Sequence, residues 1–443
     1  MSDPSPTRPA DSTEVGSYFV ANYPPFSLWT HEAVEADAQP ALNQPPADVP
    51  LGLYLHIPFC RKRCHFCYYR VYTDKNASEV AEYLDVVARE WELYATQPAI
   101  AGRPLSFVYF GGGTPSFLSV KQLQGLVDRL TAVTPWTTAE EITFECEPGT
   151  LTEPKLSQIR DMGITRLSLG LEHFDDEVLE LNGRAHRSAE IFRAYGFAQS
   201  LDFPQINIDL IAGMLGDTDE RWRDAGQRTI DMSPDSVTIY QMELPYNTTI
   251  SGDLLKGTGQ FTERVANWDT KRRWVDEAFA ALEAAGYSVG SAYTAVKRPE
   301  RTRFVYRDQL WRGADLAALG VASFGHVNGV HMQNLDTWGP YAAAVQRGEL
   351  PLNRAFRPTD EERLIREFVL QLKLGSIQPG YFQQKYGVDV IERFGEPLAS
   401  LRRDGYLLAA DGDQVALTRT GLLRVDSLLP RFFLPEHTKV RYT

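Results

Sequence analysis

Three of the four cysteines in this 443-residue chain lie within eight residues, as Cys60, Cys64 and Cys67. Thiolates at this C-x3-C-x2-C spacing can surround one soft metal centre. A [4Fe–4S] cluster held by three cysteines leaves one iron open to a small molecule, as a reactive site requires. A zinc ion would need a fourth ligand, for which the alternatives are His65 and Cys146. The basic residues 61–63 would either place positive charge beside an anionic cluster or face solvent.

A second chemical feature is the glycine triplet at residues 111–113, which is followed by Thr114. Glycines carry no side chain, so backbone there can approach a ligand closely. Taken alone, the triplet fits an ordinary tight turn between a strand and a helix equally well. Because it comes one predicted strand after the cysteine loop, we interpret it as part of the same ligand site.

The elements that must position these residues begin at residue 51. Short apolar runs predict strands at 51–57, 105–110, 141–146, 166–171, 205–211 and 236–242. Helix-like segments lie between and after them, near 78–96, 119–133, 152–162, 175–182, 188–201 and 218–232. Buried apolar strands that alternate with helices are typical of parallel sheets. We therefore expect an α/β fold, a partial (β/α)6 TIM-like barrel, with an open Rossmann sheet as the alternative. The cysteine loop follows the first strand, where β/α barrels build their sites.

The flanking regions differ in composition. Residues 1–50 contain nine prolines and predict an N-terminal arm that is either disordered or docked through an apolar island at 23–29. We divide the rest into a core at 51–245, a barrel extension with substrate-facing loops at 246–350, and a C-terminal domain at 351–443. Helical segments at 360–374, 378–386 and 388–404 precede a hairpin signal around residue 412, which resembles a winged helix. Its mixed charge favours a structural or lid role over DNA binding.

Composition excludes several other classes of function. The chain has 45 Lys+Arg against 58 Asp+Glu, a net charge of −13, which disfavours general binding to nucleic acids or anionic membranes. No apolar run approaches the roughly 18 residues of a membrane span. The N-terminus lacks the basic and apolar regions of a secretory signal, and the few cysteines are clustered. These features predict a protein of the reducing cytoplasm.

Taken together, the motifs resemble a known family. The segment 54–60, the cysteine loop and the GGGTP run at 111–115 are similar to the radical S-adenosylmethionine (SAM) superfamily. The detail resembles its oxygen-independent coproporphyrinogen III oxidase (HemN-type) branch, over residues 51–425. Further matches are FECEP at 144–148, RLSLG at 166–170, NIDLI at 207–211 and LP at 244–245. The resemblance implies a [4Fe–4S] cluster and SAM as cofactors, with room in this branch for a second SAM.

The resemblance also implies roles for particular residues. The three cysteines of the loop would each bind one iron, and SAM would chelate the fourth. The residues implied to contact SAM or flank it are Tyr54, Phe66, Gly112, Gly113, Thr114, Glu145, Glu172, Arg184 and Asp209. Acids suit the sulfonium and ammonium groups of SAM, and Arg184 can pair with its carboxylate. The plainer alternatives are a strand-end cap for Asp209 and a surface salt bridge for Arg184. No catalytic residue is assigned.

The sequence departs from the oxidases at three positions in two motifs. The oxidases proper carry Cys-Gly-Cys at the end of the loop, whereas here Cys67 is followed by Tyr68 and Tyr69, and Glu172 replaces their Gln. The segments 182–186 and 310–315 look more like the haem-chaperone and class C methyltransferase relatives.

Three functions therefore remain open. The first is an oxidoreductase similar to coproporphyrinogen dehydrogenase, which would act on a tetrapyrrole in porphyrin biosynthesis. The second is a class C methyltransferase or cyclopropanase acting on an unsaturated carbon of a natural product. The third is a haem chaperone. Either enzyme would cleave SAM reductively to a 5′-deoxyadenosyl radical, with electrons from a flavodoxin- or ferredoxin-type donor.

Other polar and aromatic residues are weaker candidates. A roomy aromatic pocket would be lined by residues at or after the late strand ends, unless they simply pack in the core: Tyr240, Gln241, Glu243, Tyr246 and Tyr293. The loop at 323–329 is expected to face the substrate. Acid/base or haem-binding roles compete with capping and packing roles for His186, His326 and His331.

Overall fold

A computed structural model describes residues 13–259, 261, 266–438 and 440–441. Its centre is a twelve-stranded sheet in the order β12-β11-β10-β9-β1-β2-β3-β4-β5-β6-β8-β7. Six strands in chain order are parallel neighbours, namely β1 (Leu51–Ile57), β2 (Leu105–Gly112), β3 (Glu141–Cys146), β4 (Arg166–Glu172), β5 (Gln205–Ala212) and β6 (Ser236–Gln241). The predicted α/β fold and its six parallel strands are confirmed.

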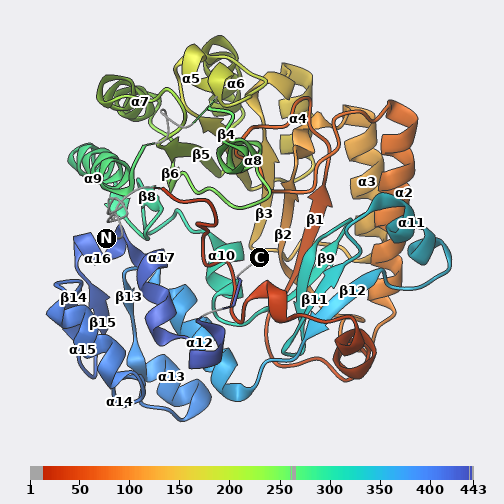
Figure 1. Ribbon diagram of the computed structural model, residues 1–443. Coiled ribbons are helices and arrows are strands. Elements are labelled where there is room, and N and C mark those ends of the chain that lie inside the picture. Colours follow the sequence, from red (N-terminus) through yellow and green to blue (C-terminus); the bar gives the residue numbers. More distant parts are fainter. Residues whose placement is uncertain (1–12, 260, 262–265, 439, 442–443) are drawn as a thin grey trace, which may run out of the picture.

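Helices connect these strands and lie on their outer side (Figure 1). They are α2 (Ala77–Ala95), α3 (Val120–Val133), α4 (Glu153–Asp161), α5 (Asp176–Leu181), α6 (Ser188–Ser200) and α7 (Asp219–Met232). Ser119 and Asp175 cap α3 and α5 by accepting hydrogen bonds from backbone N–H groups of the first turn. Thr152 stands at the N-cap of α4 without such a bond. Capping residues in the sequence therefore place the helix starts closely.

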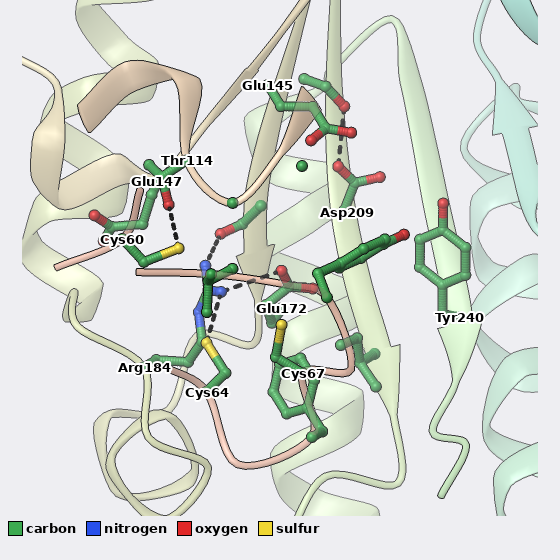
Figure 2. Close-up of a pocket in the computed structure, with 18 of the residues that line it drawn as sticks. Cys60, Cys64, Cys67, Thr114, Glu145, Glu147, Glu172, Arg184, Asp209 and Tyr240 are labelled. Atoms are coloured by element: carbon green, nitrogen blue, oxygen red, sulfur yellow. Dashed lines mark hydrogen bonds and ion pairs between the residues drawn. The ribbon is translucent and has the colours of Figure 1, made fainter. Parts of the chain in front are cut away.

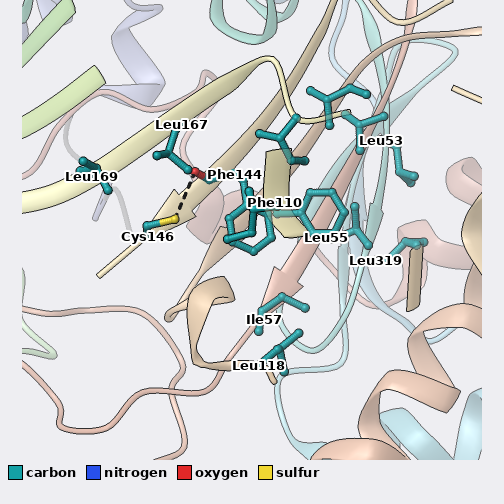
Figure 3. Packing of buried hydrophobic residues seen from close by; sticks show 14 of the residues in the cluster. Leu53, Leu55, Ile57, Phe110, Leu118, Phe144, Cys146, Leu167, Leu169 and Leu319 are labelled. Atoms are coloured by element: carbon teal, nitrogen blue, oxygen red, sulfur yellow. Dashed lines mark hydrogen bonds between the residues drawn. The ribbon is translucent and has the colours of Figure 1, made fainter. Parts of the chain in front are cut away.

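Apolar side chains of the strands fill the space beneath the helices. Leu53, Leu55 and Ile57 of β1 are fully buried and pack with Phe110 and Phe144 of the next two strands (Figure 3). Each such side chain contributes about 1.5–3 kcal/mol through burial. Since side chains alternate along a strand, the intervening residues of β1 point to the opposite, inner face. That inner face is where the polar site residues gather.

The parallel strands do not close on themselves. Beyond β1 the sheet continues with β9 (Asp315–Leu319), β10 (Phe324–Val327), β11 (Val330–Asn334) and β12 (Leu352–Phe356). Beyond β6 it continues with β8 (Thr294–Val296) and β7 (Ser288–Val289). The remaining helices of this region are α8 (Thr249–Lys256), α9 (Trp268–Ala284), α10 (Val305–Leu310) and α11 (Trp338–Gln346). The short strands β7 and β8 pair antiparallel, because the chain turns between them.

The C-terminal region builds its own small core. Its elements are α12 (Asp360–Leu372), β13 (Ser376–Ile377), α13 (Pro379–Tyr386), α14 (Val390–Arg393), α15 (Gly395–Arg403), β14 (Leu407–Ala410), β15 (Val415–Leu417), α16 (Arg419–Leu422) and α17 (Val425–Leu428). Phe368, Phe394 and Phe432 pack together at its centre. Helices followed by a hairpin form the expected winged-helix-like arrangement. The sequence did not predict β13, since two residues carry no recognisable alternation.

The N-terminal arm packs against both parts of the molecule (Figure 1, red). Its helical elements within residues 13–50 are short, at Phe26–Leu28, Val34–Ala38 and Gln39–Leu42 (α1). Val20 and Tyr23 are fully buried in the C-terminal core, and the N–H of Gly16 donates to the Leu244 carbonyl at 2.7 Å. Of the two alternatives for the arm, docking therefore applies to residues 13–50, and residues 1–12 lie outside the described part. Among the described residues, no helix has the length and apolar character needed to cross a bilayer.

Candidate functional site

A cavity of about 320 Å³ lies at the carboxyl ends of the parallel strands (Figure 2). Every residue predicted to hold the cluster or SAM lines it except Tyr54. Tyr54 lies behind the wall, where its hydroxyl is 3.3 Å from Nδ1 of His56 and its ring stacks on Tyr109. The parallel topology brings the predicted residues together, because the carboxyl ends of parallel strands meet at one edge.

The cysteine loop follows β1, and its thiols receive hydrogen bonds from other elements. The Thr114 hydroxyl donates to Sγ of Cys60 at 3.3 Å, and Nη1 of Arg184 donates to Sγ of Cys64 at 3.4 Å. Burial raises the pKa of the Cys60 thiol to about 11 and that of Cys67 to about 12. Charged donors beside sulfur favour a thiolate, the form that binds metals.

The other two candidate ligands have contacts of their own. Nδ1 of His65 is 3.0 Å from the Leu181 carbonyl oxygen, and His65 is not part of the cavity wall. Cys146 borders the cavity but packs in the apolar core, with Sγ near the Phe144 carbonyl at 3.9 Å (Figure 3). Within the described ranges, no three His, Cys, Asp or Glu side chains are placed to share a single metal ion.

The basic residues 61–63 are exposed to solvent, as one alternative expected, yet two of them also make defined contacts. Arg61 forms a two-pronged ion pair with Glu147, at 3.0 and 3.2 Å. Arg63 donates to the Cys67 carbonyl at 3.1 Å. Both contacts brace the backbone that carries the thiols.

The glycine turn is required by close packing within the protein itself. Gly112 has a φ of +111°, and a Cβ there would lie 2.5 Å from Nδ1 of His56. A Cβ on Gly113 would lie 2.9 Å from the Ile57 carbonyl oxygen, to which its own N–H donates at 2.8 Å. These contacts lay the turn against the end of β1, beside the cysteine loop. Backbone at both glycines lines the cavity.

Three carboxyl groups face the cavity from neighbouring strands. Tyr109 donates to Oε1 of Glu145 at 2.6 Å, and the Ser168 hydroxyl donates to Asp209 at 2.9 Å. Burial raises the pKa of Glu145 to about 7, that of Glu172 to about 7, and that of Asp209 as well. Neighbouring carboxylates also raise the pKa values of Glu145 and Glu172. Nearby arginines lower the pKa values of all three groups, and hydrogen bonds lower those of Glu145 and Asp209. A cationic ligand would stabilise their ionised forms.

Arg184 connects the acids to the cysteine loop. Besides its bond to Cys64, it donates through Nη2 to the Gly170 carbonyl at 2.6 Å and pairs with Glu172 at 3.5 Å. Glu172 reaches it because β4 bulges there and the residue adopts a φ of 64°. The side chain of Arg184 is 11% exposed, so the surface-salt-bridge alternative is wrong. Its Nε has no hydrogen-bond partner among the described residues.

Several site residues were missed or misplaced by sequence reasoning. Glu147 lines the cavity and binds both Arg61 and His186, the latter at 3.0 Å. Burial opposes its ionisation, but His186 and the arginines lower its pKa to about 2. His186 is therefore a buried partner of Glu147, and Arg187 takes the N-cap of α6. The one sequence signal for Glu147 was its place in the FECEP run, directly after the buried Cys146.

The late-strand residues divide into two groups. Tyr240, Gln241 and Glu243 line the cavity, and Tyr293 packs on Tyr240. Tyr246 is 45% exposed and stands outside the wall.

The predicted substrate-facing loop is wrong, because residues 324–334 form the β10–β11 hairpin on the far edge of the sheet. His326 and His331 pair there, with their Nδ1 atoms 2.8 Å apart. Neither histidine lines the cavity that holds the cysteines.

Comparison with known proteins identifies the class. Residues 54–228 match the model of the Radical SAM superfamily, and these residues contain the cysteine loop and strands β2 to β5. Residues 54–228 therefore form a Radical SAM domain, in keeping with the parallel sheet and the cavity.

The chain is also similar to relatives over most of its length. The chain is 25% identical to an oxygen-independent coproporphyrinogen III oxidase of Synechocystis sp., covering 93% of this chain and 91% of the relative. It is 26% identical to the heme chaperone HemW of Bacillus subtilis, covering 84% and 96%. The solved structure of coproporphyrinogen III oxidase (HemN) from Escherichia coli matches with a TM-score of 0.80 at 24% identity, over 93% of this chain and 96% of that one, and so shares its fold. Over most of its length the chain is therefore similar to proteins of this HemN-type branch.

Proposed function

We propose that the protein is a radical SAM oxidoreductase that acts on the side chains of a tetrapyrrole. The observation that carries this proposal is the set of groups around one cavity: three thiols, a glycine turn, three carboxyls and a buried arginine. The full-length similarity to coproporphyrinogen III oxidases supports the tetrapyrrole substrate. The expected reaction is oxidative decarboxylation of propionate side chains.

The cavity residues fit a [4Fe–4S] cluster held by Cys60, Cys64 and Cys67. Each thiolate would bind a different iron, so the three sulfurs need not converge on one point, as a zinc ion would require. The donors Thr114 and Arg184 stabilise the thiolate form against the effect of burial. Since burial raises two of the thiol pKa values, assembly of the cluster must release protons.

The cavity residues also fit SAM. The unpaired Nε of Arg184 can donate to its carboxylate, while Glu145, Glu172 and Asp209 attract its ammonium and sulfonium groups. Backbone at Gly112 to Thr114 and the ring of Phe66 would contact the rest of the molecule. When bound, the cluster and SAM would supply the radical chemistry, a 5′-deoxyadenosyl radical able to abstract hydrogen. The protein's own residues bind, orient and exclude water.

Further parts of the proposal concern partners and location. A flavodoxin- or ferredoxin-type protein would supply the electron, and a second SAM would bind beside the first, as the branch implies. The four cysteines are free, which supports a reducing compartment, the cytoplasm.

Two observations favour second candidates. The similarity to HemW supports a haem chaperone that binds haem without consuming SAM. Tyr68 and Tyr69, where the oxidases have Gly-Cys, stack at 4.5 Å in the cavity wall. This replacement supports a class C methyltransferase, which would yield S-adenosylhomocysteine as a second product.

One anaerobic experiment separates these functions. The reconstituted protein is incubated with dithionite and SAM, with and without coproporphyrinogen III, and the products are analysed by mass spectrometry. Substrate-dependent 5′-deoxyadenosine, carbon dioxide and a porphyrinogen lighter by carboxyl groups are expected. An unchanged porphyrinogen with S-adenosylhomocysteine would favour methyl transfer. Stoichiometric haem binding without SAM cleavage would favour the chaperone.

A further inference from the structure

One wall of the cavity carries aromatic rings from three separate parts of the chain. Tyr240, at the end of β6, lies across the cavity from Cys60 and Thr114 (Figure 2). Phe19 of the N-terminal arm meets Tyr240 at 5.6 Å and Tyr293 at 5.9 Å, both edge to face. Phe19 and Tyr240 line the cavity, and Tyr240 is 37% exposed. This wall therefore offers ring surface to a ligand.

The same wall holds two buried acceptor atoms without partners. Gln241 donates through Nε2 to the Leu423 carbonyl at 2.9 Å. That bond fixes the orientation of the amide, and its Oε1 is buried and unpaired among the described residues. Oε2 of Glu243 is likewise buried and unpaired. A buried unsatisfied polar atom costs about 1–3 kcal/mol, so two in one cavity wall point to a ligand that supplies donors.

Lys271, whose charge acts on Glu243, has its own partners. Nζ of Lys271 donates to the Thr13 hydroxyl at 2.7 Å and to the Met242 carbonyl at 2.8 Å. It also lies 3.4 Å from the centre of the Trp268 ring. Burial raises the pKa of Glu243 and lowers that of Lys271. Lys271 therefore supports Glu243 electrostatically without occupying its free oxygen.

We propose that Gln241 and Glu243 form a recognition subsite that accepts hydrogen bonds from ring N–H groups of the substrate, whose rings lie against Tyr240 and Phe19. This inference rests on the proposed function, since a porphyrinogen presents four pyrrole N–H groups, which donate but do not accept. Ligand groups that only accept hydrogen bonds would be disfavoured here. The subsite makes these four residues determinants of substrate specificity.

The test uses Gln241→Met, which keeps the shape and removes the acceptor, together with Glu243→Gln and Phe19→Ala. Gln199→Met is the control, because that exposed glutamine of α6 also donates to a backbone carbonyl, that of Met232 at 3.2 Å, away from the cavity. The readouts are KM and kcat for 5′-deoxyadenosine formation with coproporphyrinogen III, and the Kd of SAM. We expect the KM to rise roughly tenfold in Gln241→Met, as one lost hydrogen bond predicts, with the Kd of SAM unchanged. An unchanged KM in both Gln241→Met and Glu243→Gln would overturn the subsite.

A binding measurement keeps this test separate from the proposed reaction. Coproporphyrinogen III does not turn over when SAM and the reductant are left out, and it keeps its four ring N–H groups, so its Kd is measured anaerobically by quenching of protein fluorescence in the same variants. Weaker binding in the variants without any turnover in the wild type would support the subsite and refute the proposed reaction. Equal binding by wild type and variants, or no binding at all, would refute the subsite.

Discussion

The pair of Arg184 and Glu172 allows the structural and ligand-binding roles of one arginine to be separated. Their side chains are 11% and 13% exposed and 3.5 Å apart. The perturbation is a double-mutant cycle of Arg184→Met, Glu172→Gln and the combined variant. Arg184→Met removes the hydrogen bond to the Gly170 carbonyl and leaves Glu172 buried without its cation.

The expected magnitudes follow from burial. Removing one partner of a buried pair destabilises by about 3–5 kcal/mol. Burial raises the pKa of Glu172 to about 7, so this group can take up a proton, and we expect about 3 kcal/mol for Arg184→Met. The double variant should be less destabilised than the sum of the single variants by about 1–3 kcal/mol. SAM binding should weaken roughly 10- to 150-fold whenever Arg184 is absent, since one charge-assisted hydrogen bond is lost.

The assay combines urea unfolding of each variant with the Kd of SAM for the reconstituted protein. Because the folded-state pKa of Glu172 is raised, its carboxyl keeps its proton in the folded protein from about pH 4.5 to 7 and ionises above that range. The coupling free energy should therefore be larger at pH 8 than at pH 6. Iron content of each variant shows that the cluster is retained.

Two results would refute this reasoning. Strict additivity at pH 8 would mean that the two side chains do not interact. A double variant that binds SAM as tightly as the wild type would mean that Arg184 does not contact the ligand.

Three further predictions follow from the site and the core. Cys64→Ala should abolish the visible absorbance of the iron–sulfur cluster and lower the iron content. Cys146→Ala, which changes a cysteine of the apolar core, should keep both. An intact four-iron cluster in Cys64→Ala would contradict the ligand assignment. Gly112→Ala should lower the free energy of unfolding by about 1–3 kcal/mol or more and weaken SAM binding, because the φ of residue 112 is +111° and the new Cβ would clash with His56. An unchanged midpoint of urea unfolding would argue against this. Glu90 is fully buried and its pKa is raised to about 8. As the pH rises from about 4.5 to 8, the free energy of unfolding of the wild type should therefore fall relative to that of Glu90→Gln, by up to about 1.4 kcal/mol per pH unit. An unchanged difference between the two proteins in urea unfolding across that range would refute this prediction.

Local pattern predicted much of the molecule. The runs that became β1 and β3 match the observed strands residue for residue, because strands buried on both faces are continuously apolar. The helices begin within a residue or two of their predicted starts, since capping residues mark them in sequence. The cysteine loop and the glycine turn are likewise local, and each carries its chemistry in a few adjacent residues.

Local pattern failed where partners are distant in sequence or strands are very short. The hairpin at 324–334 reads as a loop of small and polar residues, but pairing with β9 and β12 makes it part of the sheet and moves His326 away from the cavity. The Pro-rich arm has no periodicity, yet Val20 and Tyr23 are buried by residues some 350 to 410 positions later.

The amino-acid sequence alone determined the thiol loop, its resemblance to the radical SAM superfamily and the alternation of strands and helices in an α/β fold, because these depend on motifs and apolar runs within short windows. Only the tertiary structure decided which charged groups meet. Arg184 with Glu172, Glu147 with Arg61, and the wall shared by Phe19 and Gln241 all join segments that separate strands carry to one place. Their pairing depends on burial and on which face of a strand each side chain takes, and a contact between distant residues leaves no periodic signal in the chain.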